Sequence, residues 1–446
     1  MKVKISFVCQ ECGYDTVQWL GKCPECGLWN TFKEIRTSAP LASKSSVSKT
    51  SLLPQADIVP RSLDKISYQA KDRQLTGFSE MDVVLGGGIV AGSVILLAGD
   101  PGVGKSTLLL QTALNISSGK SPKTVLYISA EESLEQIKLR SLRVAKTKPG
   151  KNFLVLSVSD TDAVLGVIAD LKPDLVIIDS IQTMESENVA GLSGSVGQIR
   201  YGAAQFIKTA KTLKIPIIMV GHVTKEGMVA GPMILSHMVD AVLFLEGDKL
   251  VSTRVLRSLK NRFGPVDEVG VFLMEEKGII EIKSPEQIFL TKHQKESLPG
   301  SVLIVTLEGS RAFLVEIQAL VNFTKMPMPR RVASGIDGRR LELLLAVLQK
   351  HAQIPTSGLD VFVNVAGGLK ISDPASDLGI CLAIYSSFKN IPLSKTVGIA
   401  EVGLLGELRA APMLEKRVKE ARKLGFKDII TSANFRTLNQ AFRSIK

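Results

Sequence analysis

The residues best suited to chemistry form a glycine-rich pattern that is typical of phosphate binding. The segment Gly99-Asp-Pro-Gly-Val-Gly-Lys-Ser106 matches the eight positions of a P-loop, between an apolar strand predicted at 94–98 and a helix predicted to begin near Ser106. Glycines let successive backbone N–H groups surround phosphate oxygens, and the helix start adds partial positive charge. We therefore expect Lys105 to reach the β- and γ-phosphates of a nucleotide and the Ser106 hydroxyl to bind Mg²⁺. The predicted ATP-binding residues are Gly99, Asp100, Pro101, Gly102, Val103, Gly104, Lys105, Ser106 and Thr107.

Acidic residues follow two further apolar strands and could complete this nucleotide site. Asp179 comes directly after four apolar residues, a position from which a carboxylate holds Mg²⁺ together with Ser106. The alternative is an acidic residue that only terminates a strand. Glu131 and Glu132 follow a strand predicted at 125–129, and either could orient the attacking water.

Two Cys-x-x-Cys pairs near the N-terminus predict a structural zinc site. Two thiolates from each tight turn can close a tetrahedral shell around Zn²⁺, and a glycine follows each pair. The short spacer between the pairs favours a small ribbon or a rubredoxin-like knuckle, with a redox pair as the alternative. Trp19 and Trp29 are expected to pack beside the metal. The predicted zinc ligands are Cys9, Cys12, Cys23 and Cys26.

The composition describes a large, mildly basic chain. Its 446 residues are 45% apolar, enough for at least two substantial cores, which excludes a disordered tail or a disulfide mini-protein. A net charge of +12 favours polyanionic partners. No apolar run reaches the roughly eighteen residues that span a bilayer, and the N-terminal residues contain no signal-peptide core. We expect a cytoplasmic protein with reduced cysteines and no membrane association.

The chain divides by composition into four parts. We predict a zinc-binding module at 1–35, a flexible linker at 36–65, an ATPase domain at 66–285 and a further α/β domain at 286–446. In the third part, short apolar strands alternate with helical stretches, which indicates a parallel sheet covered on both faces. The strands predicted there are 94–98, 125–129, 175–178, 217–220 and 241–245.

Several motifs together resemble the bacterial RadA (Sms) family of recombination proteins. They are the P-loop with its following Thr107, Tyr127-Ile-Ser-Ala-Glu-Glu-Ser133, Ile177-Ile-Asp-Ser-Ile-Gln-Thr183, Lys260-Asn-Arg-Phe-Gly264, and the cysteine pairs with Trp19-Leu-Gly-Lys-Cys23 and Trp29-Asn-Thr31. The resemblance implies an α/β, RecA-like P-loop ATPase core related to hexameric replicative helicases. It further implies a zinc-binding, homohexameric motor that binds single-stranded and branched DNA, promotes branch migration in recombination and repair, and has a RecA-type recombinase as a partner.

The resemblance also assigns roles to particular residues. Glu131 takes the position of the catalytic glutamate and Asp179 the Walker-B position. Lys260 and Arg262 would reach the ATP of the adjacent subunit, so that hydrolysis depends on ring assembly. From the residues alone, this pair of cations could equally be an ordinary surface pattern.

Two glycine-rich loops are candidates for DNA contact. They lie at 187–197 and 224–232, each after the carboxyl end of a predicted strand, and in RecA-like rings such loops face the central channel. Ordinary mobile surface loops are the alternative. The predicted DNA-binding cations are Arg200 and Lys225. His222 could sense the γ-phosphate or simply hold a structural hydrogen bond.

The last part of the chain contains the segments 360–365, 373–379 and 401–409, followed by a helix predicted from Leu414. These segments are similar to the proteolytic domain of Lon. A Lon site needs a serine activated by a lysine. Ser376 falls at the serine position, but Glu415 falls where the lysine is expected and Lys416 is displaced by one residue. We therefore expect a non-proteolytic platform for assembly and DNA binding, with arginines at 329–340 as a candidate duplex contact or a solvated face. Two rival functions remain open, an ATP-dependent protease and an ATP-switched binding module.

Overall fold

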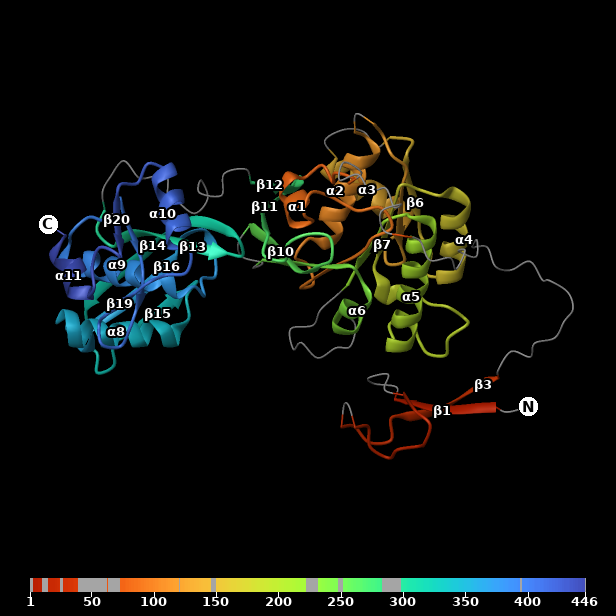
Figure 1. The fold of residues 1–446 in the computed structure, drawn as a ribbon, viewed down its shortest axis with the longest axis horizontal. Helices are drawn as coiled ribbons and strands as arrows, with labels where there is room; N and C mark the ends of the chain where they lie inside the picture. Colours follow the sequence, from red (N-terminus) through yellow and green to blue (C-terminus); the bar gives the residue numbers. More distant parts are fainter. Residues whose placement is uncertain are drawn as a thin grey trace, which may run out of the picture. The chain divides into compact units, whose positions relative to one another are not determined.

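The computed structural model describes most of the chain. The described residues are 3–9, 15–24, 27–38, 62, 73–119, 121–145, 150–221, 232–247, 252–282, 298–393 and 395–445. They belong to two compact units (Figure 1). The first contains residues 1–249, 254–266 and 272–281, and the second contains 250–253, 267–271 and 282–446. Apart from 36–38 and 62, the segment predicted to be a flexible linker lies outside the described residues.

A small antiparallel sheet is formed by the N-terminal residues. Its strands are β1 (Val3–Cys9), β2 (Asp15–Thr16) and β3 (Phe32–Ser38), in the order β2-β1-β3. Cys9 pairs with Phe32 at the end of the β1–β3 ladder. The first cysteine pair therefore begins where this ladder ends, and β3 continues to Ser38, beyond the predicted end of the zinc-binding module.

A large sheet dominates the first unit. Across the described residues its strand order is β12-β11-β10-β9-β4-β8-β7-β5-β6. The six strands from β9 to β6 run parallel, and every strand predicted from the sequence is among them. The strands are β4 (Val94–Gly99), β5 (Val125–Ser129), β6 (Phe153–Leu156), β7 (Leu175–Asp179), β8 (Ile217–Val220), β9 (Ala241–Glu246), β10 (Thr253–Asn261), β11 (Val269–Glu275) and β12 (Gly278–Glu281).

The sheet differs from the predicted one at one edge. β10 runs antiparallel to β9, and β12 runs antiparallel to β11. A parallel neighbour would need a crossover connection of about a dozen residues or more, and the connections here are too short for one. The predicted parallel strands are confirmed, and the antiparallel strands at this edge are an addition that the sequence analysis did not include.

Helices cover both faces of the parallel strands, as predicted. Alternate residues of β4 enter two separate cores, with Ile95 and Leu97 on one face and Val94 and Leu96 on the other. The first core includes residues of α1, α2 and α3, and the second includes residues of α4, α5 and α6. The helices are α1 (Ser79–Val84), α2 (Lys105–Ser117), α3 (Leu134–Val144), α4 (Thr161–Leu171), α5 (Val196–Leu213) and α6 (Pro232–Met238).

The second unit is built on a mixed sheet with the order β15-β16-β14-β13-β17-β20. Gly379 of α9 lies so close to Ile304 of β13 that a Cβ at Gly379 would be 2.0 Å from the Ile304 Cγ2 atom. Ala421 of α10 packs in a core with Leu303 and Val305, the neighbours of Ile304 along β13. Because successive side chains of a strand point to opposite faces, α9 and α10 cover opposite faces of this sheet.

The elements of the second unit are also regular. Its strands are β13 (Ser301–Glu308), β14 (Arg311–Phe323), β15 (Arg331–Ser334), β16 (Leu359–Val365), β17 (Thr396–Ile399), β18 (Glu401–Val402), β19 (Leu408–Arg409) and β20 (Asp428–Thr431). Its helices are α8 (Gly338–Ala352), α9 (Asp377–Lys389), α10 (Leu414–Lys423) and α11 (Leu438–Arg443). Within the described ranges, no helix of either unit combines the length and the apolar character needed to cross a bilayer.

Candidate functional site

The predicted phosphate loop connects β4 to α2 in the first unit. Gly99, Gly102 and Gly104 have φ angles of +147°, +80° and +111°, in a region that residues with side chains rarely adopt. A Cβ at Gly99 would be 2.3 Å from the Leu245 carbonyl oxygen of β9. Backbone conformation therefore favours glycine at all three positions, and packing against Leu245 also requires it at Gly99.

Lys105 is the first residue of α2 and is only 3% exposed. Its Nζ donates hydrogen bonds to the carbonyl oxygens of Gly99 at 2.8 Å and Asp100 at 3.0 Å. Burial lowers the pKa of Lys105, an effect that the negative charges of Asp179, Asp100 and Glu131 oppose. The ammonium group is thus held inside the loop, close to the carboxylates around it.

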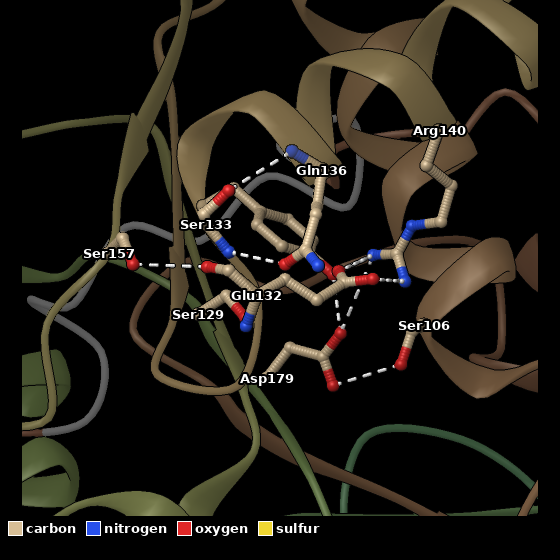
Figure 2. A network of polar contacts seen from close by, with 9 residues as sticks. Ser106, Ser129, Glu132, Ser133, Gln136, Arg140, Ser157 and Asp179 are labelled. Carbon is tan, nitrogen blue, oxygen red and sulfur yellow. Dashed lines mark hydrogen bonds and ion pairs between the residues drawn. The ribbon is translucent and has the colours of Figure 1, made fainter.

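Asp179 ends β7 and is 6% exposed. Its two oxygens have different partners. Oδ1 accepts a hydrogen bond from the Ser106 hydroxyl at 3.0 Å (Figure 2), and Oδ2 accepts one from the Tyr127 hydroxyl at 2.5 Å. The parallel pairing of β5 with β7 places Ser129 opposite Asp179. The pairing of these strands places Asp179 and the turn after β5 at the same edge of the sheet. The hydrogen bond from Ser106 shows that the P-loop lies at this edge as well.

The structure separates the two glutamates between which the sequence could not decide. Glu131 accepts a hydrogen bond from the Ser180 hydroxyl at 2.8 Å. Glu132 forms an ion pair with Arg140 of α3, at 3.0 Å from Nη1 to Oε1 and 2.9 Å from Nη2 to Oε2. Burial raises the pKa of Glu132, while Arg140 acts to lower it. Glu132 is therefore engaged by a cation of its own chain.

Lys260 and Arg262 lie far along the sheet from the P-loop of the same chain. β10 pairs Asn261 with Ala241, which in turn pairs with Ile95 near the start of β4, whereas the P-loop leaves the end of β4 at Gly99. At about 3.3 Å per residue, Arg262 is displaced from Gly99 by roughly 16 Å along the strand direction. These two cations are therefore remote from their own phosphate loop.

Lys260 contacts the last turn of α6, and Arg262 contacts the segment that connects α6 to β9. The Lys260 Nζ donates to the carbonyl oxygens of Ser236 at 2.7 Å and His237 at 3.4 Å, close to the end of α6. The Arg262 Nη1 lies 3.5 Å from Oδ1 of Asp240, a 4% exposed residue that also pairs with Lys211. Burial and Arg262 both lower the pKa of Lys260, and Asp240 opposes them.

The N-terminal module presents half of its predicted zinc ligands. Cys9 and Cys23 are each 1% exposed, whereas Cys12 and Cys26 lie outside the described residues. The Gly27 N–H donates to the Cys23 carbonyl at 2.9 Å, and Gly27 has a φ of +72°. Buried cysteine sulfurs fit the thiolate donor set that Zn²⁺ prefers.

The two tryptophans of this module are largely exposed. Trp19 is 55% exposed and Trp29 is 69% exposed, and their packing beside a metal stays a prediction. Gly21 lies between them, because a Cβ there would be 3.6 Å from the Trp19 ring and 3.7 Å from the Trp29 ring. The Lys22 ammonium lies over the Trp29 ring, 5.8 Å from its centroid. The indoles contact a glycine and a cation and face solvent.

Comparison with known proteins identifies the family. DNA repair protein RadA of Bacillus subtilis (strain 168) is 45% identical to this chain over 434 residues, which are 97% of this chain and 93% of that protein. The chain belongs to the DNA repair protein RadA family. DNA repair protein RadA of Pseudomonas aeruginosa is similar as well, with 44% identity over 96% of this chain and 93% of that protein.

Two family models locate domains within this RadA-family chain. Residues 63–228 match an AAA domain, and residues 7–34 match a rubredoxin metal binding domain. A crystal structure of the RadB recombinase is 24% identical, with a TM-score of 0.37, covering 47% of this chain and 99% of that chain. The family models confirm the predicted ATPase domain and the predicted zinc ribbon, and these domains are consistent with the expected use of ATP, Mg²⁺ and Zn²⁺.

The candidate DNA-binding residues of the RadA-family chain are only partly described. Arg200 is exposed on α5, and the loop before it is held by Gln198, whose Nε2 donates to the Ser186 and Val189 carbonyls at 3.0 and 2.7 Å. Lys225 and His222 lie outside the described residues.

Among the arginines at 329–340, Arg340 forms an ion pair with the buried Asp377. Arg340 is therefore engaged within the second unit.

Ser376 of the second unit is buried, and its hydroxyl is already used. It is 3% exposed and donates a hydrogen bond to the Asp373 carbonyl at 2.6 Å. Asp373 in turn accepts a hydrogen bond from the buried Arg417 at 2.5 Å. The Lys416 Nζ donates instead to the Ser310 carbonyl. The cation that shares Asp373 with this serine is an arginine, which stays protonated and cannot act as a general base.

Sequence reasoning missed Tyr127 and Arg140. A hydroxyl-bearing residue within the otherwise apolar strand at 125–128 was the available signal for Tyr127. Arg140 follows the buried Ile137 by three residues, so the two side chains lie on the same side of α3. The helical period was therefore the available signal that Arg140 faces the sheet. Both residues meet Asp179 only through tertiary packing.

Proposed function

We propose that this RadA-family chain is a DNA-dependent ATPase motor that binds single-stranded DNA and promotes branch migration of recombination intermediates. The observation that carries the proposal is the distribution of charged groups in the first unit. The P-loop, Asp179 and Glu131 meet at one edge of the sheet, while Lys260 and Arg262 lie far from that edge. A ring of copies would let these cations complete the site of an adjacent copy.

The phosphate loop and Asp179 would hold the nucleotide and its metal. Lys105 would exchange its contacts with loop carbonyls for phosphate oxygens, while Ser106 and Asp179 would hold Mg²⁺, with Thr107 as an additional contact. When bound, Mg²⁺ neutralises negative charge on the transferring phosphate. Backbone N–H groups between Gly99 and Thr107 would supply the remaining phosphate contacts.

Glu131 is the residue we propose to orient the attacking water. Its hydrogen bond from Ser180 fixes the side chain next to the strand that carries Asp179, and it is exposed at the loop after β5. Glu132 is the weaker candidate because its carboxylate is paired with Arg140. The Arg140 guanidinium contacts both oxygens of the Glu132 carboxylate, which disfavours that residue as the group that orients water.

Lys260 and Arg262 are proposed to act on the nucleotide of the neighbouring subunit in a hexameric ring. An arginine supplied in this way can contribute on the order of 10³–10⁵ in rate. Lys260 also contacts the end of α6, the helix that follows the second candidate DNA loop. This contact offers a direct route by which DNA bound near Lys225 could alter the neighbouring ATP site.

The other parts of the chain are assigned supporting roles. We propose zinc bound by Cys9, Cys12, Cys23 and Cys26 in a module at 1–35, a linker at 36–65, the motor at 66–285 and a Lon-like domain at 286–446, in a cytoplasmic protein with a RecA-type recombinase as a partner. The hydrogen bond of Ser376 to a backbone carbonyl supports a non-proteolytic role for the Lon-like domain. Arg200 and Lys225 are the proposed contacts to the DNA backbone.

The test compares ATP hydrolysis and unwinding of forked DNA by the intact chain and by Lys105→Ala, each with and without single-stranded DNA. We expect DNA to stimulate hydrolysis and Lys105→Ala to abolish both activities. Lys123→Ala, which changes an exposed lysine of the same unit, is the matched control and should behave as the unaltered chain. Hydrolysis without strand separation would instead favour an ATP-switched binding module, and ATP-dependent cleavage of a protein substrate would favour a protease.

A further inference from the structure

The carboxylate of Asp179 is held on the side that faces away from the phosphate loop. Its Oδ1 faces the Ser106 hydroxyl, and its Oδ2 accepts the Tyr127 hydroxyl at 2.5 Å and lies 3.9 Å from the Arg140 Nη2. Without these contacts, the carboxylate could rotate about its side-chain bonds and exchange its two oxygens. The contacts on Oδ2 fix which oxygen is presented to Ser106.

The tyrosine and the arginine form a directed chain of hydrogen bonds. Arg140 donates from Nη2 to the Tyr127 oxygen at 3.1 Å, and Tyr127 donates its proton to Asp179. A donor that is itself accepting a hydrogen bond from a cation is polarised, which strengthens the bond that it makes. Tyr127 is 0% exposed and packs edge-on against Phe153, so its hydroxyl cannot swing away.

Arg140 is in turn held by the turn that carries the candidate catalytic glutamates. The N-terminus of α3 is closed by a capping box between Ser133 and Gln136. In this turn the Glu132 N–H donates to Ser129 at 3.2 Å, and the Glu132 carbonyl accepts from Ser157 at 3.0 Å. Figure 2 shows Arg140 reaching from α3 to the Glu132 carboxylate above Asp179. The turn after β5 and the end of β7 are therefore tied together through one side chain.

We propose that Tyr127 and Arg140 are positioning residues that orient Asp179 for a divalent cation at the nucleotide site. This inference rests on the proposed nucleotide site and adds two residues to it. A phenylalanine would fill the space of Tyr127, so apolar packing alone does not require the hydroxyl. Groups that hydrogen-bond to the ligands of a metal commonly change metal affinity by about 10- to 100-fold when they are removed.

The experiment measures Mg²⁺ dependence without measuring turnover. Binding of a fluorescent, slowly hydrolysed ATP analogue to the full chain is titrated with MgCl₂ and repeated in EDTA, and thermal melting is recorded for each variant. We expect Tyr127→Phe to raise the half-saturating Mg²⁺ concentration about tenfold while leaving analogue binding in EDTA unchanged. Arg140→Gln should raise it about three- to tenfold, and Arg140→Lys, which keeps the cation, should lie between Arg140→Gln and the unaltered chain.

Tyr201→Phe is the matched control, because it removes a hydroxyl that contacts the surface carboxylate of Asp162 in the same unit. It should leave the Mg²⁺ titration unchanged. The inference is overturned if Tyr127→Phe titrates like the unaltered chain, or if it weakens analogue binding equally in Mg²⁺ and in EDTA, which would indicate a purely structural hydroxyl. If the unaltered chain shows no Mg²⁺-dependent binding, the proposed nucleotide site itself fails, and that result is distinct from failure of the tyrosine alone.

Discussion

Each unit of the chain brings a cation, a serine and an aspartate together, and the two groups differ in what surrounds them. In the first unit, Lys105 and Ser106 lie at the start of a helix on a glycine loop, and Ser106 points at the Asp179 side chain. In the second unit, Ser376 donates to the Asp373 backbone, and Arg417 pairs with the Asp373 side chain.

The two clusters differ in the other groups that surround the cation. Arg417 is 2% exposed and also donates to the carbonyls of Val305 at 2.6 Å and Pro412 at 2.9 Å, which occupies its guanidinium from several sides. The P-loop instead presents backbone N–H groups of glycines with positive φ. In both clusters the cation donates to groups of the chain, but only the first cluster lies at a glycine loop of the phosphate-binding pattern, where a ligand could replace the carbonyl partners of Lys105. The following predictions test this contrast, from the largest expected effect to the smallest.

Arg262→Ala should lower DNA-stimulated ATP hydrolysis by on the order of 10³-fold or more while leaving nucleotide binding intact, because this cation would act on the neighbouring copy. The measurement is steady-state hydrolysis with single-stranded DNA, and Arg143→Ala, an exposed arginine on α3, is the control. Mixing Arg262→Ala with Lys105→Ala chains should restore part of the activity, since some interfaces then combine an intact loop with an intact arginine. Normal turnover by Arg262→Ala would remove it from the mechanism.

Glu131→Gln should slow hydrolysis by about 10²- to 10⁴-fold because the amide cannot accept a proton from water. Glu132→Gln should have a smaller effect, exerted through Arg140. Single-turnover hydrolysis of bound ATP distinguishes the two, and a larger loss at Glu132 would reverse their proposed roles.

Arg417→Met should destabilise the second unit by about 3–5 kcal/mol, because Asp373 would keep its charge without the partner. Urea unfolding monitored in the second unit measures this loss. ATP analogue binding by the first unit should be retained below the unfolding transition, and impaired binding there would contradict the separation of the two clusters.

Ser376→Ala should cost only about 1 kcal/mol of stability, the contribution of one hydrogen bond, and should leave ATP hydrolysis and DNA unwinding unchanged. A fluorophosphonate probe for activated serines is expected not to label the unaltered chain. Labelling that is lost in Ser376→Ala would show that the second cluster is a catalytic site after all.

Much of the ATPase fold followed from local pattern. Continuous apolar runs predicted the central strands, and the strand, loop and helix around Gly99–Ser106 could be located because each requirement is local in the chain. The edge formed by β10–β12 was missed because antiparallel additions to a sheet depend on connection length and pairing rather than on residue type.

The sequence by itself determined the residues that could bind phosphate, the paired cysteines and membership of the candidate family, since these depend on residue type at fixed spacing. Only the tertiary structure decided that Glu132 is paired with Arg140, that Tyr127 holds Asp179, and that Lys260 and Arg262 are remote from their own loop. These are relations between side chains on different strands and helices. Their distances are set by sheet register and helix packing, which residue spacing along the chain does not encode.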